Sequence, residues 1–99
     1  MRTIDYLDAV KARFCLPSDY KLAEKLGLTR SHISKLRLDK SHLGDDTAIY
    51  VAKLLQIEPI KVVAHANIER SQRANDPERL QMWTDLSEKL SKYAASQPV

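Results

Sequence analysis

Apolar residues recur at intervals of three and four along most of the chain, a period that predicts helices rather than strands. Six segments follow this period, over residues 3–14, 19–26, 30–37, 45–56, 59–70 and 77–94. Thr3, Ser18 and Thr29 stand where a polar side chain would cap the start of a helix. Pro17 and Gly27 stand where helices end. The pattern therefore predicts an all-α protein.

The segments 19–26 and 30–37 are joined by a very short break. Gly27 supplies the left-handed backbone that ends one helix, and Thr29 begins the next. Helices joined so closely must cross steeply, and Ala23 provides the small side chain that such a crossing needs. The apolar side chains expected to seal this corner against the core are Leu22, Leu26, Leu28, Ile33 and Leu36. We interpret the pair as a helix-turn-helix.

The last segment has the clearest start signal. Asp76 is a capping residue, Pro77 stands at the first helical position, and Glu78 carries a negative charge in the first turn. One stripe, about a third of the helix circumference, holds Met82, Trp83, Leu86, Leu90 and Tyr93. This helix is therefore amphipathic.

Two interpretations of the stripe stay open. It packs on the chain's own five-helix core, or it forms a dimer seam in which Trp83, Leu86, Leu90 and Tyr93 meet a second copy; the seam is favoured. The two interpretations are compatible if Trp83 is buried within its own chain while Leu90 and Tyr93 contact the second copy across the twofold axis.

Length and composition fit one small helical domain. The chain has 99 residues and two glycines, too few for the turns of a β-sandwich or barrel. Its one cysteine, Cys15, allows no internal disulfide, which suggests a reducing compartment. We expect the side chain of Cys15 to be buried, as a small apolar residue would be. Charges interrupt every apolar run before it reaches the length of a signal sequence or a membrane span. We expect a cytoplasmic protein without a membrane segment.

Basic residues concentrate in the first half of the chain. The net charge is +3, from 16 Lys and Arg against 13 Asp and Glu. Residues 1–44 hold nine basic and five acidic side chains, whereas residues 45–75 hold four of each. A positive excess around the helix-turn-helix suits a polyanionic partner.

The segment "LAEKLGLTRSHISKLR" resembles the Cro/cI-like (XRE-type) helix-turn-helix proteins, which include phage repressors and many bacterial regulators. Downstream, "IYVAKLLQIEPIKVV" is similar to the fourth and fifth helices of that family, so the resemblance covers roughly residues 3–66. One feature differs: the family usually has a glycine shortly after the third helix, where this chain has "LDK", and Gly44 comes later.

The resemblance implies a five-helix lambda-repressor-like helix-turn-helix domain over residues 1–70, followed by a C-terminal amphipathic helix and short tail over residues 71–99. It implies a sequence-specific transcriptional regulator of double-stranded DNA, a repressor of phage or mobile-element type. Such a protein binds an inverted-repeat operator as a homodimer.

Carried onto this chain, the resemblance implies two sets of DNA contacts. The residues expected to read bases in the major groove are Arg30, Ser31, Ser34 and Lys35. The residues expected to contact phosphate are Ser18, Thr29, His32, Arg37, Lys40 and Ser41. Asp19 occupies a position where the family often has a neutral donor such as Gln, so Ser18 and nearby backbone amides are expected to make that contact.

Other function classes find less support. An antitoxin is the main alternative: its C-terminal segment, residues 70–99, would cover a toxin while the helix-turn-helix represses the operon. The chain has no nucleophile motif, glycine-rich phosphate loop or enclosed carboxylate pair, so we expect neither an enzyme nor a cofactor. His32, His42 and His65 are not spaced to share a helix turn, which argues against a metal site.

Overall fold

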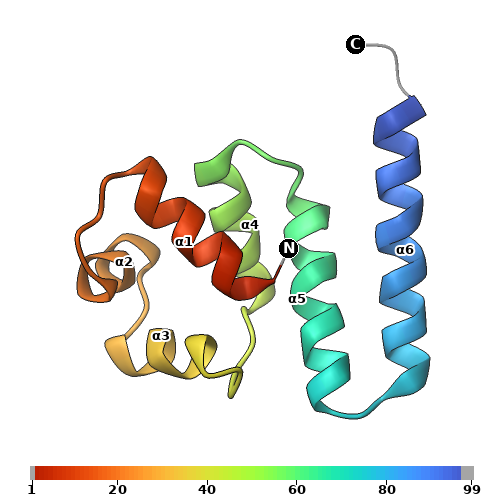
Figure 1. The fold of residues 1–99 in the computed structure, drawn as a ribbon, viewed down its shortest axis with the longest axis horizontal. Coiled ribbons are helices and arrows are strands. Elements are labelled where there is room, and N and C mark those ends of the chain that lie inside the picture. The colour runs from red at the N-terminus through yellow and green to blue at the C-terminus, as the bar shows by residue number, and fades with distance from the viewer. Residues whose placement is uncertain (1, 97–99) are drawn as a thin grey trace.

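The computed structural model describes the backbone of residues 2–96 and the side chains of residues 2–89. Six helices form within that range: α1 (Thr3–Arg13), α2 (Asp19–Leu26), α3 (Arg30–Arg37), α4 (Asp45–Leu55), α5 (Pro59–Arg73) and α6 (Pro77–Ser96) (Figure 1). The same residues contain no strand, so the all-α prediction is confirmed. The expected division between residues 70 and 71 falls inside α5, which continues to Arg73.

Capping side chains stand at the start of three of the six described helices. The hydroxyls of Ser18 and Thr29 accept hydrogen bonds from the backbone N–H groups of Lys21 and His32, at 3.2 and 3.0 Å. Asp76 accepts from the backbone N–H of Arg79 at 3.1 Å. These three caps agree with the sequence pattern.

The start of α1 differs from the prediction. Arg2 is the capping position, and Thr3 is already the first helical residue and is buried. The backbone N–H of Thr3 donates to the carboxylate of Glu69 on α5 at 2.6 Å. Asp5 accepts locally from the backbone N–H of Arg2 at 2.8 Å, and the distant Glu69 satisfies the next N–H group, which a sequence pattern does not reveal.

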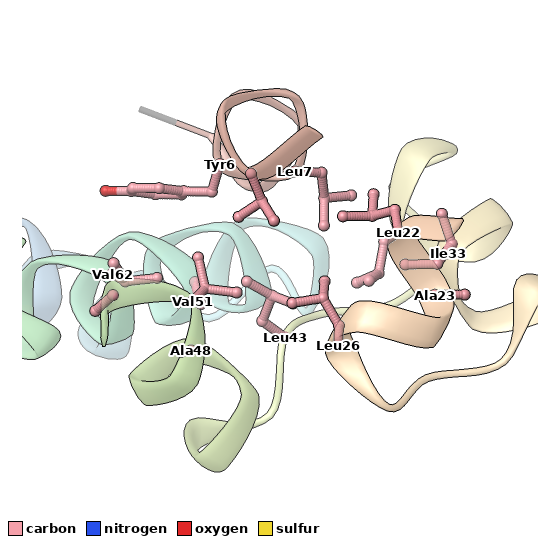
Figure 2. Packing of buried hydrophobic residues seen from close by; sticks show 14 residues of the cluster. Tyr6, Leu7, Leu22, Ala23, Leu26, Ile33, Leu43, Ala48, Val51 and Val62 are labelled. Atoms are coloured by element: carbon pink, nitrogen blue, oxygen red, sulfur yellow. The ribbon is translucent and has the colours of Figure 1, made fainter. Parts of the chain in front are cut away.

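Helices α1 to α5 enclose one hydrophobic core (Figure 2). Its most deeply buried large side chains are Tyr6, Leu7, Val10, Leu22, Ile33, Val51 and Val62. Leu43, from the segment between α3 and α4, joins the same cluster. Ala23 is only 3% exposed, as expected of a small residue between closely packed helices.

Two apolar residues are more exposed than the sequence suggests. Ile49 on α4 is 45% exposed, because Ala48, Val51 and Ala52 form the stripe that faces the core. Cys15 was expected to be buried and is exposed, since α1 ends before it and its backbone turns to a φ of 52°.

Helix α6 packs along α5 and extends past its N-terminal end (Figure 1). With 20 residues against 15, α6 is longer by about 7 Å at about 1.5 Å per residue. Trp83 is partly buried, whereas Met82 is 63% and Leu86 37% exposed. Leu90 and Tyr93 lie outside the side chains that the structure describes.

None of the described helices combines the length and apolar character needed to cross a membrane.

Candidate nucleic-acid interface

A tight connection places α3 across the end of α2. Gly27 adopts a φ of +68°, and the N–H of Leu28 donates to the carbonyl oxygen of Ala23 at 2.9 Å. A Cβ atom on Gly27 would meet nothing within 4 Å, so the backbone angle alone favours glycine there. The chain then enters α3 at Thr29 without a longer loop.

One face of α3 is buried and the opposite face is open. Ile33 and Leu36 are 1% and 2% exposed and hold the helix on the core. All four residues expected to read bases are exposed: Arg30, Ser31, Ser34 and Lys35. The structure therefore gathers the whole set on the outward side of one helix.

Three of the four also line one open groove, of about 660 Å³, between α3 and the start of α2. The residues around it are Ser18, Asp19, Tyr20, Arg30, Ser31, Ser34, Arg37 and Leu38. Lys35 is exposed but is not part of this lining. Ser18 and Thr29, both expected at phosphate, cap the two helices that form the groove.

Arg37 is held by carboxylates of two other helices. Its guanidinium donates two hydrogen bonds to Asp19, at 2.8 and 2.9 Å, and lies 3.0 Å from a carboxylate oxygen of Asp8. The hydrogen bond from Arg37 holds the pKa of Asp19 below its usual range, and the same bond raises the pKa of Arg37. Lys11 completes the cluster, 3.2 Å from Asp19.

This ion-pair cluster joins α1, α2 and α3. It explains why an aspartate occupies position 19, because Asp19 receives charged groups from α1 and α3. The sequence contained opposite charges at these positions, but only the fold brings residues 8, 11, 19 and 37 together.

The last turn of α5 holds the segment that follows α3, residues 38–44, through hydrogen bonds. Arg73 donates to the carbonyl oxygen of Ser41 at 2.9 Å and to the carboxylate of Asp39 at 3.3 Å. Asp39 has a φ of 58°, so an aspartate takes the left-handed position near which the resembled family has a glycine. Aspartate tolerates this conformation better than most residues.

Lys40 and Ser41 belong to the same segment, and His32 on α3 lies beside it. The Ser41 hydroxyl is 3.4 Å from Nε2 of His32, and Lys40 is exposed. Next to them, burial lowers the pKa of His42, and the positive charges of Arg70 and Arg73 lower it further. This edge therefore gathers basic groups beside the residues expected at phosphate.

Tyr20 is one of two groove residues, the other being Leu38, that were not predicted from the sequence. It is 50% exposed, and its ring centroid lies 5.7 Å from Cζ of Arg30. The only indication of it in the sequence is that a large aromatic side chain stands outside the apolar face of the helix predicted over residues 19–26.

Among the described residues, no three His, Cys, Asp or Glu side chains are grouped so that they could hold a metal ion. His65 lies away from the groove, with Nδ1 hydrogen-bonded to the hydroxyl of Tyr6.

Comparisons of this chain with protein-family models, curated proteins and solved structures found no match. The groove and the exposed face of α3 are therefore the features that bear on function.

Proposed function

We propose that this chain is a sequence-specific transcriptional regulator that binds double-stranded DNA, and that it acts as a repressor of phage or mobile-element type. The observation that carries the proposal is the exposed face of α3, where Arg30, Ser31, Ser34 and Lys35 stand together beside a tight α2–α3 turn. An α-helix fits the major groove of B-DNA, and side chains near its N-terminus reach base edges.

The residue types on this face suit base recognition. Arg30 is in the first turn of α3 and has two parallel donors for O6 and N7 of a guanine. Lys35 is exposed about one turn further along and addresses a neighbouring base. Ser31 and Ser34 lie between them as short donors and acceptors.

Phosphate contacts surround this face in the proposal. Ser18 and Thr29 stand at helix N-termini, where backbone N–H groups attract anions. Lys40 and Ser41 follow the DNA backbone past the end of α3, and His32, on α3, lies within 3.4 Å of the Ser41 hydroxyl. A phosphate contact by Arg37 would have to share its guanidinium with Asp8 and Asp19, so we assign it chiefly to holding α3 in place.

A homodimer on an inverted repeat is part of the proposal. Regulators of this kind bind two half-sites about 34 Å apart, which requires a twofold axis between two copies. The apolar residues Met82 and Leu86 on α6 are exposed in the single chain and support a seam there. The expected seam residues are Trp83, Leu86, Leu90 and Tyr93, of which the last two lie outside the described side chains.

A second candidate function, an antitoxin, is favoured by the extension of α6 past α5 (Figure 1). In that case residues 70–99 would cover a toxin while the α2–α3 pair represses the operon. Hydrogen exchange on the isolated chain separates the two: a stable α6 in a homodimer favours the plain repressor, and an α6 that exchanges as freely as an unfolded peptide favours the antitoxin.

Selection of duplexes from a random DNA pool tests the main proposal. The bound fraction should converge on an inverted repeat, and its affinity should fall steeply between about 50 and 200 mM salt, because Lys and Arg release counterions from phosphates. Failure of the pool to converge on any sequence would contradict a sequence-specific regulator.

A further inference from the structure

Tyr20 belongs to α2 but stands beside the exposed face of α3. Its ring lines the open groove together with Arg30, and half of the residue is exposed to solvent. The buried face of α2 is supplied by Leu22, Ala23 and Leu26, so the core does not account for an aromatic ring at position 20.

The ring of Tyr20 is within cation–π distance of Arg30. The Cζ atom of Arg30 lies 5.7 Å from the ring centroid, and a guanidinium within about 6 Å of an aromatic face is attracted by it. Within the described part of the chain, Arg30 forms no ion pair with a carboxylate. The ring is therefore the group that orients this guanidinium in the free protein.

A second cation near the same ring has its own partner. The ammonium of Lys21 lies 5.7 Å from the ring centroid and 3.6 Å from the carboxylate of Glu24, one turn along α2. Lys21 is thus held along its own helix, whereas Arg30 reaches the ring across the groove.

We propose that Tyr20 is a positioning residue for Arg30: its ring holds the guanidinium at the mouth of the groove, so that both donors meet O6 and N7 of one guanine in the major groove. This inference rests on the proposed function. An arginine side chain loses much rotamer freedom when it binds, and a ring that already restricts it lowers that entropic cost. Tyr20 acts through Arg30 and does not contact the base.

The first test uses the free protein. The aromatic ring should shift the NMR signals of the Arg30 δ-methylene protons upfield, and Tyr20→Leu should remove the shift while Tyr20→Phe keeps it. Tyr50→Leu is the matched control, because Tyr50 is an exposed tyrosine on α4 and does not line the groove. Arg30 signals that are the same in Tyr20→Leu and wild type would overturn the proposal.

The second test uses the duplex that the wild-type chain selects from a random pool. Tyr20→Leu should weaken binding about two- to fivefold, the size expected of an exposed cation–π pair. In the Arg30→Ala background the same substitution should have no further effect. Replacement of the guanine read by Arg30 with 7-deazaguanine removes the N7 acceptor, and the resulting loss should be smaller in Tyr20→Leu than in wild type.

The outcomes separate the two proposals. Effects of Tyr20→Leu and Arg30→Ala that multiply independently would mean that Tyr20 contacts DNA by itself, which overturns the positioning role. Binding by Tyr20→Phe that is as weak as that of Tyr20→Leu would mean that the hydroxyl is the active group, with the same consequence. A pool that never converges would instead refute the proposed function, while the NMR shift still reports whether the ring holds Arg30.

Discussion

Buried polar side chains of this protein are paired between α1 and α5. The hydroxyl of Tyr6 is hydrogen-bonded to Nδ1 of His65, with the ring centroids 5.8 Å apart, and Glu69 accepts from the backbone of Thr3. Burial raises the pKa of Tyr6 to about 12 and lowers the pKa of His65. A neutral imidazole, whose Nδ1 accepts a hydrogen bond from the hydroxyl of Tyr6, is therefore the form that fits the fold.

The stability of the protein should depend on pH through His65. Its pKa is lower in the folded state than the ordinary value of 6.5, so the unfolded chain binds a proton more readily. The free energy of unfolding should be highest above about pH 6.5 and fall as the pH is lowered through that value. Urea titrations from pH 7.5 to 5.5 would measure the slope.

His65→Gln should flatten this dependence, because glutamine keeps an acceptor for Tyr6 but does not titrate. Burial also lowers the pKa of His42, so His42→Gln should remove a further part of the slope. A His65→Gln variant that retains the full wild-type slope would contradict the assignment.

Ala23→Leu should destabilise the fold, since the residue is 3% exposed and lies at the contact of α2 with α3. Added methylenes in a packed core cost about 1–3 kcal/mol, which thermal melting would detect. Ala12→Leu is a suitable control, because Ala12 is exposed on α1. Equal melting temperatures for Ala23→Leu and wild type would mean that the contact has room for a larger side chain.

Arg30 and Lys40 should affect DNA binding in different ways. Arg30→Ala should cost about 1–3 kcal/mol on the selected duplex and relax the preference at one base position in each half-site. Lys40→Ala should weaken selected and scrambled duplexes alike and make the salt dependence shallower by about one unit.

Titrations of both duplexes at several salt concentrations would compare these variants. Lys53→Ala, an exposed lysine on α4, is the control and should change little. If Arg30→Ala weakens both duplexes by the same factor, Arg30 does not read a base.

At the scale of elements, helix limits and caps followed from local sequence because a cap needs only neighbouring residues. Thr29, Gly27 and Asp76 mark their helix ends in the sequence and in the structure. The outward face of α3 was also predicted, since helical period alone decides which side Ile33 takes. Local pattern therefore sufficed for these helix ends and for the faces of α3, but not for the start of α1, where Thr3 donates to the distant Glu69.

Contacts between distant helices could not be obtained in this way. The pairing of Arg37 with Asp8 and Asp19 depends on how α1, α2 and α3 pack. The approach of Tyr20 to Arg30 likewise depends on the angle at which α2 and α3 cross. The sequence shows which residues are charged, but which of them form ion pairs depends on how the helices pack.

Gly27→Ala should be more harmful than Gly44→Ala. Gly27 has a φ of +68°, and an L-residue in this conformation costs about 1–2 kcal/mol. Gly44 has a φ of −65°, which alanine adopts freely, and neither site has atoms within 4 Å of an added Cβ. Melting temperatures of the two variants would measure the difference; similar losses would mean that backbone strain is not the reason for Gly27.

At the scale of the whole molecule, the basic and the apolar surfaces overlap in part. The positive excess lies in residues 1–44, which include α1 to α3 and also the exposed side chains of Tyr20 and Leu38, whereas Met82 and Leu86 are exposed on α6. In the proposed complex the exposed face of α3 meets DNA while α6 meets a second copy.

Leu86→Glu should weaken the proposed homodimer, because a buried carboxylate without a partner is costly at an apolar seam. Sedimentation should show a shift toward monomers, and operator affinity should fall with it. Gln72→Glu adds the same charge at an exposed site on α5 and is the control. A wild-type chain that sediments as a monomer at concentrations well above those used for binding would contradict the proposed seam.

The hydrogen bonds from Arg73 to the segment after α3 connect that segment to the end of α5. Arg73 is the last residue of α5, immediately before the short connection to α6, and its guanidinium holds the carbonyl oxygen of Ser41. Arg73 therefore ties the position of this segment to the end of α5. A partner of α6 that moved the end of α5 would also move the segment, and in that case reciprocity requires that each ligand alter the affinity for the other by the same factor.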